Sequence, residues 1–82
     1  MRYMKQALDL IFPQSLIKKP VIHEMAKKFN VVFNLRRAKV TDTIGEIVLE
    51  LEGEKDNLDK AVAWLKTQGV KVDPITHDTM ES

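Results

Sequence analysis

The chain contains no cysteine, and it has only three glycines and three prolines among its 82 residues. Without cysteine the chain cannot supply disulfides, thiolate nucleophiles, or the ligands of cysteine-bound zinc and iron–sulfur sites. A composition of 44% hydrophobic and 30% charged residues is typical of a folded globular domain. Because a chain of this length supports one core, we expect a single domain at residues 1–75, followed by a polar tail at 76–82.

The chain also lacks an excess of charge of either sign and any long apolar run. The 13 basic and 12 acidic residues leave a net charge of +1, too little to attract nucleic acid or an anionic membrane. No stretch approaches the roughly 20 apolar residues of a membrane span, and the first residues lack the pattern of a signal peptide. We therefore expect a cytoplasmic protein without membrane insertion and without a nucleic-acid partner.

The spacing of apolar residues indicates alternating strands and helices. Pro20 is expected in the first turn of the first helix, and Asn30 at its end. The order β-α-β-β-α-β predicts an α+β, ferredoxin-like sandwich, in which a four-stranded antiparallel sheet carries two helices on one face. The predicted strands cover residues 4–12, 31–40, 44–52 and 70–72, the last extending to 75 if it continues past Pro74, and the predicted helices cover residues 15–29 and 55–68.

The face of the sheet without helices is the expected functional surface. Pairing Arg36 with Glu50, and Ala38 with Val48, places the even-numbered residues of the second strand on that face. Beside Ala7, Asp9 and Ile11 of the first strand, it then carries Val32, Asn34, Arg36, Ala38, Val40, Val48 and Glu50.

Small aliphatic residues around an amide and a guanidinium suit an amino-acid ligand. Arg36 would bind a carboxylate, and Asn34 would donate and accept hydrogen bonds, above an apolar floor. Two other uses remain open: salt bridges from the arginines to Glu50 or Glu52, and pairing of two such faces or edges in a dimer. The predicted ligand-binding residues are Asn34, Arg36, Val32, Ala38 and Val48.

The same register turns Arg37 and Lys39 toward the core, which is unfavourable for charged side chains. Two explanations are open: a β-bulge shifts the strand there, or the strand ends splay apart and the long side chains reach solvent.

Catalytic and metal-binding patterns are sparse. Ser15 has no base at a useful spacing, and we find no glycine-rich phosphate loop, so we expect no enzymatic activity and no cofactor. His23 and His77 are far apart in the sequence, so we expect no metal site. An RNA-binding sheet would expose aromatic residues, but Phe33 has the parity of the core.

The segment from Asn30 to Gly53 resembles the NIL domain family, which takes its name from an Asn-Ile-Leu signature in its second strand. The matching positions here are Asn34, Leu35 and Arg36. The Phe12-Pro13 end of the first strand, Gly45, and the run from Ala61 to Val70 also look like the family's pattern. The resemblance extends over roughly residues 5–75.

NIL domains occur at the C-terminus of methionine-transporter ATPase subunits, where they pair and bind methionine to inhibit uptake, and they also precede ferredoxin modules. The resemblance thus implies a non-enzymatic regulatory domain that binds a small amino acid such as methionine and acts as a homodimer. A transporter ATPase or a ferredoxin would be its partner. The alternative is a structural module for dimerisation or docking, associated with an iron–sulfur ferredoxin.

Overall fold

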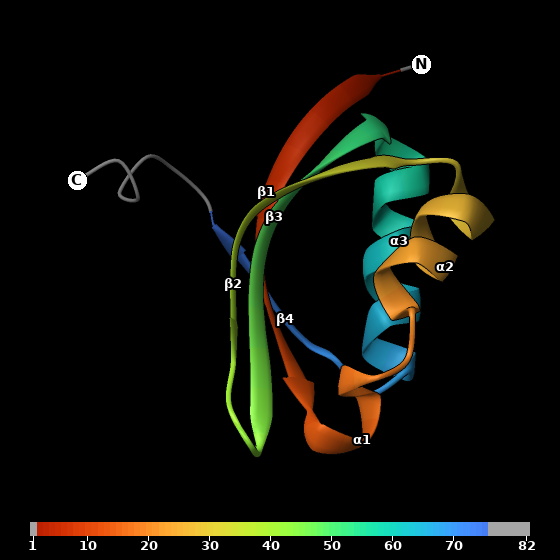
Figure 1. Ribbon diagram of the computed structural model, residues 1–82. Coiled ribbons are helices and arrows are strands. Elements are labelled where there is room, and N and C mark those ends of the chain that lie inside the picture. The colour runs from red at the N-terminus through yellow and green to blue at the C-terminus, as the bar shows by residue number, and fades with distance from the viewer. Residues whose placement is uncertain (1, 76–82) are drawn as a thin grey trace.

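A four-stranded antiparallel sheet forms one layer of the molecule, and helices form the other (Figure 1). The computed structural model describes residues 2–75. The strand order is β2-β3-β1-β4, with the helices on one face of the sheet and the other face open. The prediction of an α+β, ferredoxin-like sandwich is confirmed. The elements are β1 (Tyr3–Pro13), α1 (Gln14–Ile17), α2 (Val21–Phe29), β2 (Val32–Val40), β3 (Ile44–Glu54), α3 (Lys55–Thr67) and β4 (Lys71–Ile75).

The first predicted helix is broken in two, so the prediction of one helix over residues 15–29 is wrong. Proline has no backbone N–H and clashes with the preceding turn, which is why α1 stops before Pro20. Pro20 instead caps α2, which begins at Val21. The end of α2 is as predicted: Asn30 takes the left-handed conformation, with φ at 56°, and its N–H donates to the Ala26 carbonyl.

The core lies between the sheet and the helices. The two central strands supply most of its sheet side, because in β1 and β3 mainly apolar side chains face the helices and mainly polar ones face away. Phe29 of α2 packs against Trp64 of α3, with ring centroids 6.0 Å apart. The largest wholly buried side chains are Leu8, Leu10, Met25, Leu49, Leu51 and Leu65.

A β-bulge in β2 changes which residues share a face. The predicted pairs, Arg36 with Glu50 and Ala38 with Val48, are wrong. Glu50 lies opposite Asn34, Val48 lies opposite Arg37, and the register shifts between Leu35 and Arg37. Of the two explanations that the sequence left open, the bulge is confirmed.

The shift turns Arg37 and Lys39 to the open face. Lys39 lies opposite Glu46 of that face. Ala38 and Val40, predicted on the open face, instead lie opposite Ile47 and Gly45, on the side of the helices.

The described helices are short. None within residues 2–75 is long and apolar enough to cross a membrane. The predicted polar tail, with His77, lies outside the described residues.

Candidate functional site

A row of side chains crosses all four strands on the open face of the sheet. Asp9 of β1 lies opposite Asp73 of β4 on one side and opposite Val48 of β3 on the other. Val48 in turn lies opposite Arg37 of β2. From β4 to β2, the row therefore consists of Asp73, Asp9, Val48 and Arg37. It has two carboxylates at one end, a guanidinium at the other end and an apolar residue between them.

Two flanking rows complete the surface. Because alternate residues of a strand face the same way, each row lies about 7 Å from the next along the strands. One flanking row contains Ala7, Glu50 and Asn34, and the other contains Ile11, Glu46 and Lys39. Asn34 thus lies one row from Arg37 on the same strand.

Val48 forms an apolar floor at the centre of this face. Only 7% of it is exposed, although no helix covers it and it is not part of the main hydrophobic core. The longer polar side chains of the neighbouring strands surround it. The centre of the open face is thus a small apolar area with charged groups around it.

Asp9 has an unmet capacity to accept hydrogen bonds. Its Oδ1 atom is buried and has no hydrogen-bond partner. Burial is the main cause that raises the pKa of the Asp9 carboxyl above its ordinary value; the carboxyls of Glu46 and Asp73 raise this pKa further, and Arg37 lowers it. A cationic group placed here would favour the ionised form of Asp9 and give its buried oxygen a donor.

The predicted ligand-binding residues do not all lie together. Val32, Asn34 and Val48 are on the open face, as predicted. Ala38 lies on the side of the helices, and Arg36 occupies the bulge without a partner in β3.

Two residues of the central row were missing from the predicted set. The uninterrupted register put Arg37 on the core-facing parity, with a bulge or splayed strand ends left open, and Asp9 was placed on the open face but given no role. The cations Arg37 and Lys39 at core-facing positions indicated an irregularity, but they did not distinguish a bulge, which turns Arg37 to the open face, from splayed ends.

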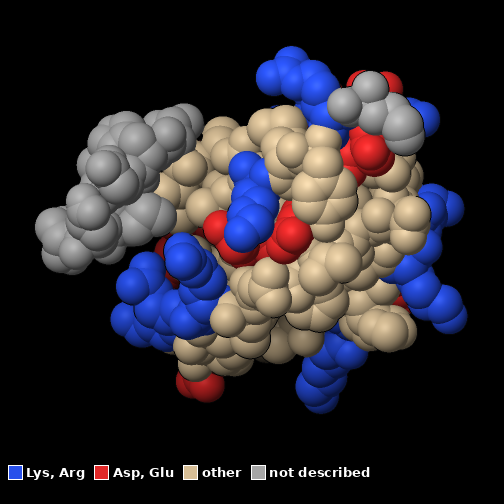
Figure 2. Space-filling model, turned by 90° about the horizontal axis from the view of Figure 1, so that it is seen from above, with Lys and Arg blue, Asp and Glu red and all other residues tan. Residues whose placement is uncertain are grey.

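Charges of both signs are mixed over the surface. Figure 2 shows basic and acidic side chains interspersed, with a group of basic side chains on the left, the side on which the sheet lies in Figure 1. Within residues 2–75, no group of three or more histidine, cysteine, aspartate or glutamate residues is placed to hold a metal ion. His23 is exposed on α2.

The chain matches a known protein family. The family model of the NIL domain matches residues 6–74. The chain belongs to the NIL domain family. The resemblance seen in the sequence is therefore confirmed.

Curated relatives of this NIL domain are named "Methionine import ATP-binding protein MetN". The protein from Helicobacter hepaticus is 30% identical over 70 residues, which is 80% of this chain and 20% of the relative. The protein from Geobacillus kaustophilus is 32% identical over 74 residues, which is 85% of this chain and 21% of the relative. The chain thus spans about a fifth of the length of these relatives.

A solved structure shares the fold of the chain. It is the C-terminal domain of an ABC transporter ATP-binding protein from Enterococcus faecalis, with a TM-score of 0.78 and 19% sequence identity. The match covers 89% of this chain and 86% of that domain. At this identity the likeness supports the fold, and the function has to be argued from the site.

Proposed function

We propose that this NIL domain is a non-enzymatic regulatory domain that binds a free amino acid, with methionine as the first candidate, on the open face of its sheet. The observation that carries the proposal is the central row, in which Asp9 and Arg37 lie on opposite sides of the apolar Val48. The relatives' role in methionine import supports the choice of ligand.

The row has the groups that a zwitterion needs. Asp9 and Arg37 are two strands apart, so their Cα atoms are about 10 Å from each other, and their side chains extend toward a ligand between them. Asp9 would accept hydrogen bonds from the ammonium group, including one at its buried oxygen. Arg37 would bind the carboxylate in a bidentate manner, with Asn34 as an additional donor. The aliphatic part of the ligand would contact Val48.

Regulation would follow from a difference in affinity. A ligand shifts the balance between two arrangements only if it binds one of them better. We propose that the domain acts as a dimer at the cytoplasmic side of an amino-acid import system, and that the bound amino acid stabilises one arrangement of the two copies relative to the transporter ATPase. Reciprocally, that arrangement would bind the amino acid more tightly.

The test is calorimetric titration of the purified chain with L-methionine, with D-methionine and L-leucine as comparison ligands and light scattering to measure the oligomeric state. We expect saturable, stereoselective binding to a dimer. Arg37→Gln and Asn34→Ala should weaken binding, because each removes donors to the carboxylate. Arg36→Gln is the matched control: it removes the neighbouring guanidinium at the bulge and should leave binding unchanged.

A folded chain that binds none of these amino acids at millimolar concentration would contradict the proposal. Equal losses from Arg36→Gln and Arg37→Gln would contradict the assignment of the carboxylate to the central row.

The alternative, a docking module beside a ferredoxin or transporter subunit, is favoured by a separate observation. Large exposed hydrophobic residues concentrate at one edge of the sheet: Val32, Leu35 and Val40 lie on β2, and Ile44 begins β3. A domain that fails to bind amino acids but retains its fold would support this alternative.

A further inference from the structure

Strand β2 is an outer strand with a free edge. It pairs with β3 on one side, and in the described part of the chain no strand pairs with its other side. Eight of its nine residues are exposed, all except Phe33. An edge of this length presents backbone N–H and C=O groups to which another extended segment can hydrogen-bond.

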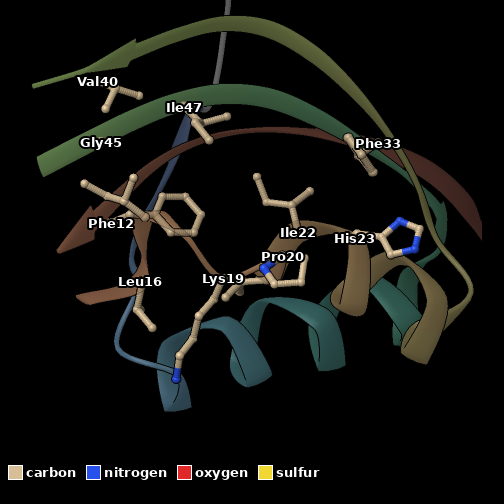
Figure 3. A pocket seen from close by; sticks show the side chains of 12 residues that line it. Phe12, Leu16, Lys19, Pro20, Ile22, His23, Phe33, Val40, Gly45 and Ile47 are labelled. Carbon is tan, nitrogen blue, oxygen red and sulfur yellow. The ribbon is translucent and has the colours of Figure 1, made fainter. Parts of the chain in front are cut away.

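An apolar cavity of about 280 Å³ lies beside this edge, on the side of the helices. Phe33 and Val40 of β2 line it together with β3, and residues of α1 and α2 form its other wall. In Figure 3 the side chains of Phe12, Ile22 and Ile47 point toward one another across the hollow, whereas the Lys19 amine and the His23 ring lie at its margins. Its volume lies just below the roughly 300 to 1,000 Å³ of small-molecule pockets, so it suits one or two side chains.

The charged residues of β2 itself are all basic, and one of them, Lys39, lies opposite Glu46 of β3. β2 contains Arg36, Arg37 and Lys39 and no acidic residue, and no acidic side chain is among those that line the cavity. Arg37 and Lys39 extend on the open face. A second copy of β2, paired antiparallel about the middle of the strand, would bring the arginines of both copies together, which is unfavourable.

These observations fit one kind of partner. The side chains of an added strand alternate between the two faces of the sheet, so apolar residues would enter the cavity while acidic residues lie beside Arg37 and Lys39. We infer that the β2 edge and its cavity form a docking site for an extended segment of a partner protein in which apolar and acidic residues alternate. Backbone hydrogen bonds would supply affinity, and the cavity would supply specificity.

The probe is a fluorescent peptide with the sequence of residues 44–52 of this chain. That sequence has an apolar residue or glycine at every odd-numbered position and glutamate at three of its five even-numbered positions, and it already pairs with the other side of β2. The control peptide has lysine in place of each glutamate. Binding is measured by fluorescence anisotropy, and circular dichroism verifies that each protein variant is folded.

Three variants of the protein test the inference. Lys39→Glu reverses a charge at the β2 edge and should weaken binding of the acidic peptide by about fivefold. Lys71→Glu is the matched control, because Lys71 lies in the same cross-sheet row on the opposite edge strand, and it should leave binding unchanged. Gly45→Ala should weaken binding by about tenfold by adding a methyl group to the cavity wall. That methyl would sit 3.6 Å from Ile17 Cγ1, an ordinary contact, so the fold should persist.

Four results would overturn the inference: no binding of the acidic peptide at millimolar concentration, equal binding of the lysine peptide, equal effects of Lys39→Glu and Lys71→Glu, or unchanged binding by Gly45→Ala. A wild-type dimer that Lys39→Glu alters and Lys71→Glu does not would also overturn it, because a second copy would then occupy the edge.

Discussion

Two leucines that face each other across β2 and β3 should differ strongly in their contribution to stability. Leu35 and Leu49 are cross-strand partners on the same face of the sheet. Leu49 has 0% of its surface exposed, whereas Leu35 has 56% exposed. The difference arises because the helices pack mainly against β1, β3 and β4 rather than against β2.

Truncation of each leucine to alanine converts this difference into free energy of unfolding. Leu49→Ala leaves a cavity in the core and should cost about 3 kcal/mol, within the range for buried leucines. A chain of this size has roughly 4 to 12 kcal/mol of stability in total, so the loss is large. The midpoint of thermal unfolding should fall by about 12 to 24 °C. Leu35→Ala removes a side chain that is more than half exposed and should cost under about 1 kcal/mol.

Urea unfolding, followed by Trp64 fluorescence and by circular dichroism, measures both variants against the unchanged chain. Coincidence of the two signals shows whether the transition is two-state. Similar losses for the two variants would refute the reasoning, because they would mean that Leu35 is buried in solution. A loss for Leu35→Ala that grows with protein concentration would identify the covering surface as another copy of the chain.

Two further predictions concern single residues. The folded state raises the pKa of Asp9 above its ordinary value of 3.8, so ionisation of this carboxyl destabilises the fold. The stability that the protonated carboxyl contributes is fully present at pH below about 3.8 and is lost as the pH rises through the raised pKa. Asp9→Asn should therefore be more stable than the unchanged chain at pH 7, with the difference shrinking in acid; urea midpoints between pH 3 and 7 measure this, and a constant difference contradicts it. Asn30→Val should lower the free energy of unfolding by about 1 to 2 kcal/mol, because a β-branched residue fits poorly at a φ of 56°, whereas Asn30→Gly should leave it unchanged. Thermal unfolding of both variants measures this, and equal losses of stability would contradict the backbone explanation.

Periodicity predicted the architecture because the central strands largely keep their alternation. In β3 apolar residues or glycines occupy every position that faces the helices, and glutamates occupy the open face except at Ile44 and Val48. The helix ends were also predictable, since Asn30 and Gly69 both adopt the positive φ that helix termination favours. The break at Pro20 was underestimated: the apolar spacing of a helix continues across it, and this spacing does not report the missing N–H.

The candidate site was less predictable because it depends on a single extra residue. A shift of one position moves every later side chain of a strand to the other face. Because of the bulge between Leu35 and Arg37, Arg37 lies on the open face and Ala38 lies on the side of the helices. Asn34 precedes the bulge and kept its predicted face. The location of a bulge depends on the pairing of both strands, and one strand's pattern reveals only that an irregularity exists.

The central claim is that an amino acid binds at the row of Asp9, Val48 and Arg37 on the open face of the sheet. A titration of the isotope-labelled chain with L-methionine, followed by two-dimensional amide NMR spectra, tests it most directly. We expect saturable shifts centred on these residues and on Asn34, with little change at the buried Leu65 of α3. Shifts centred on the helices, or no shifts at saturating methionine, would contradict the claim.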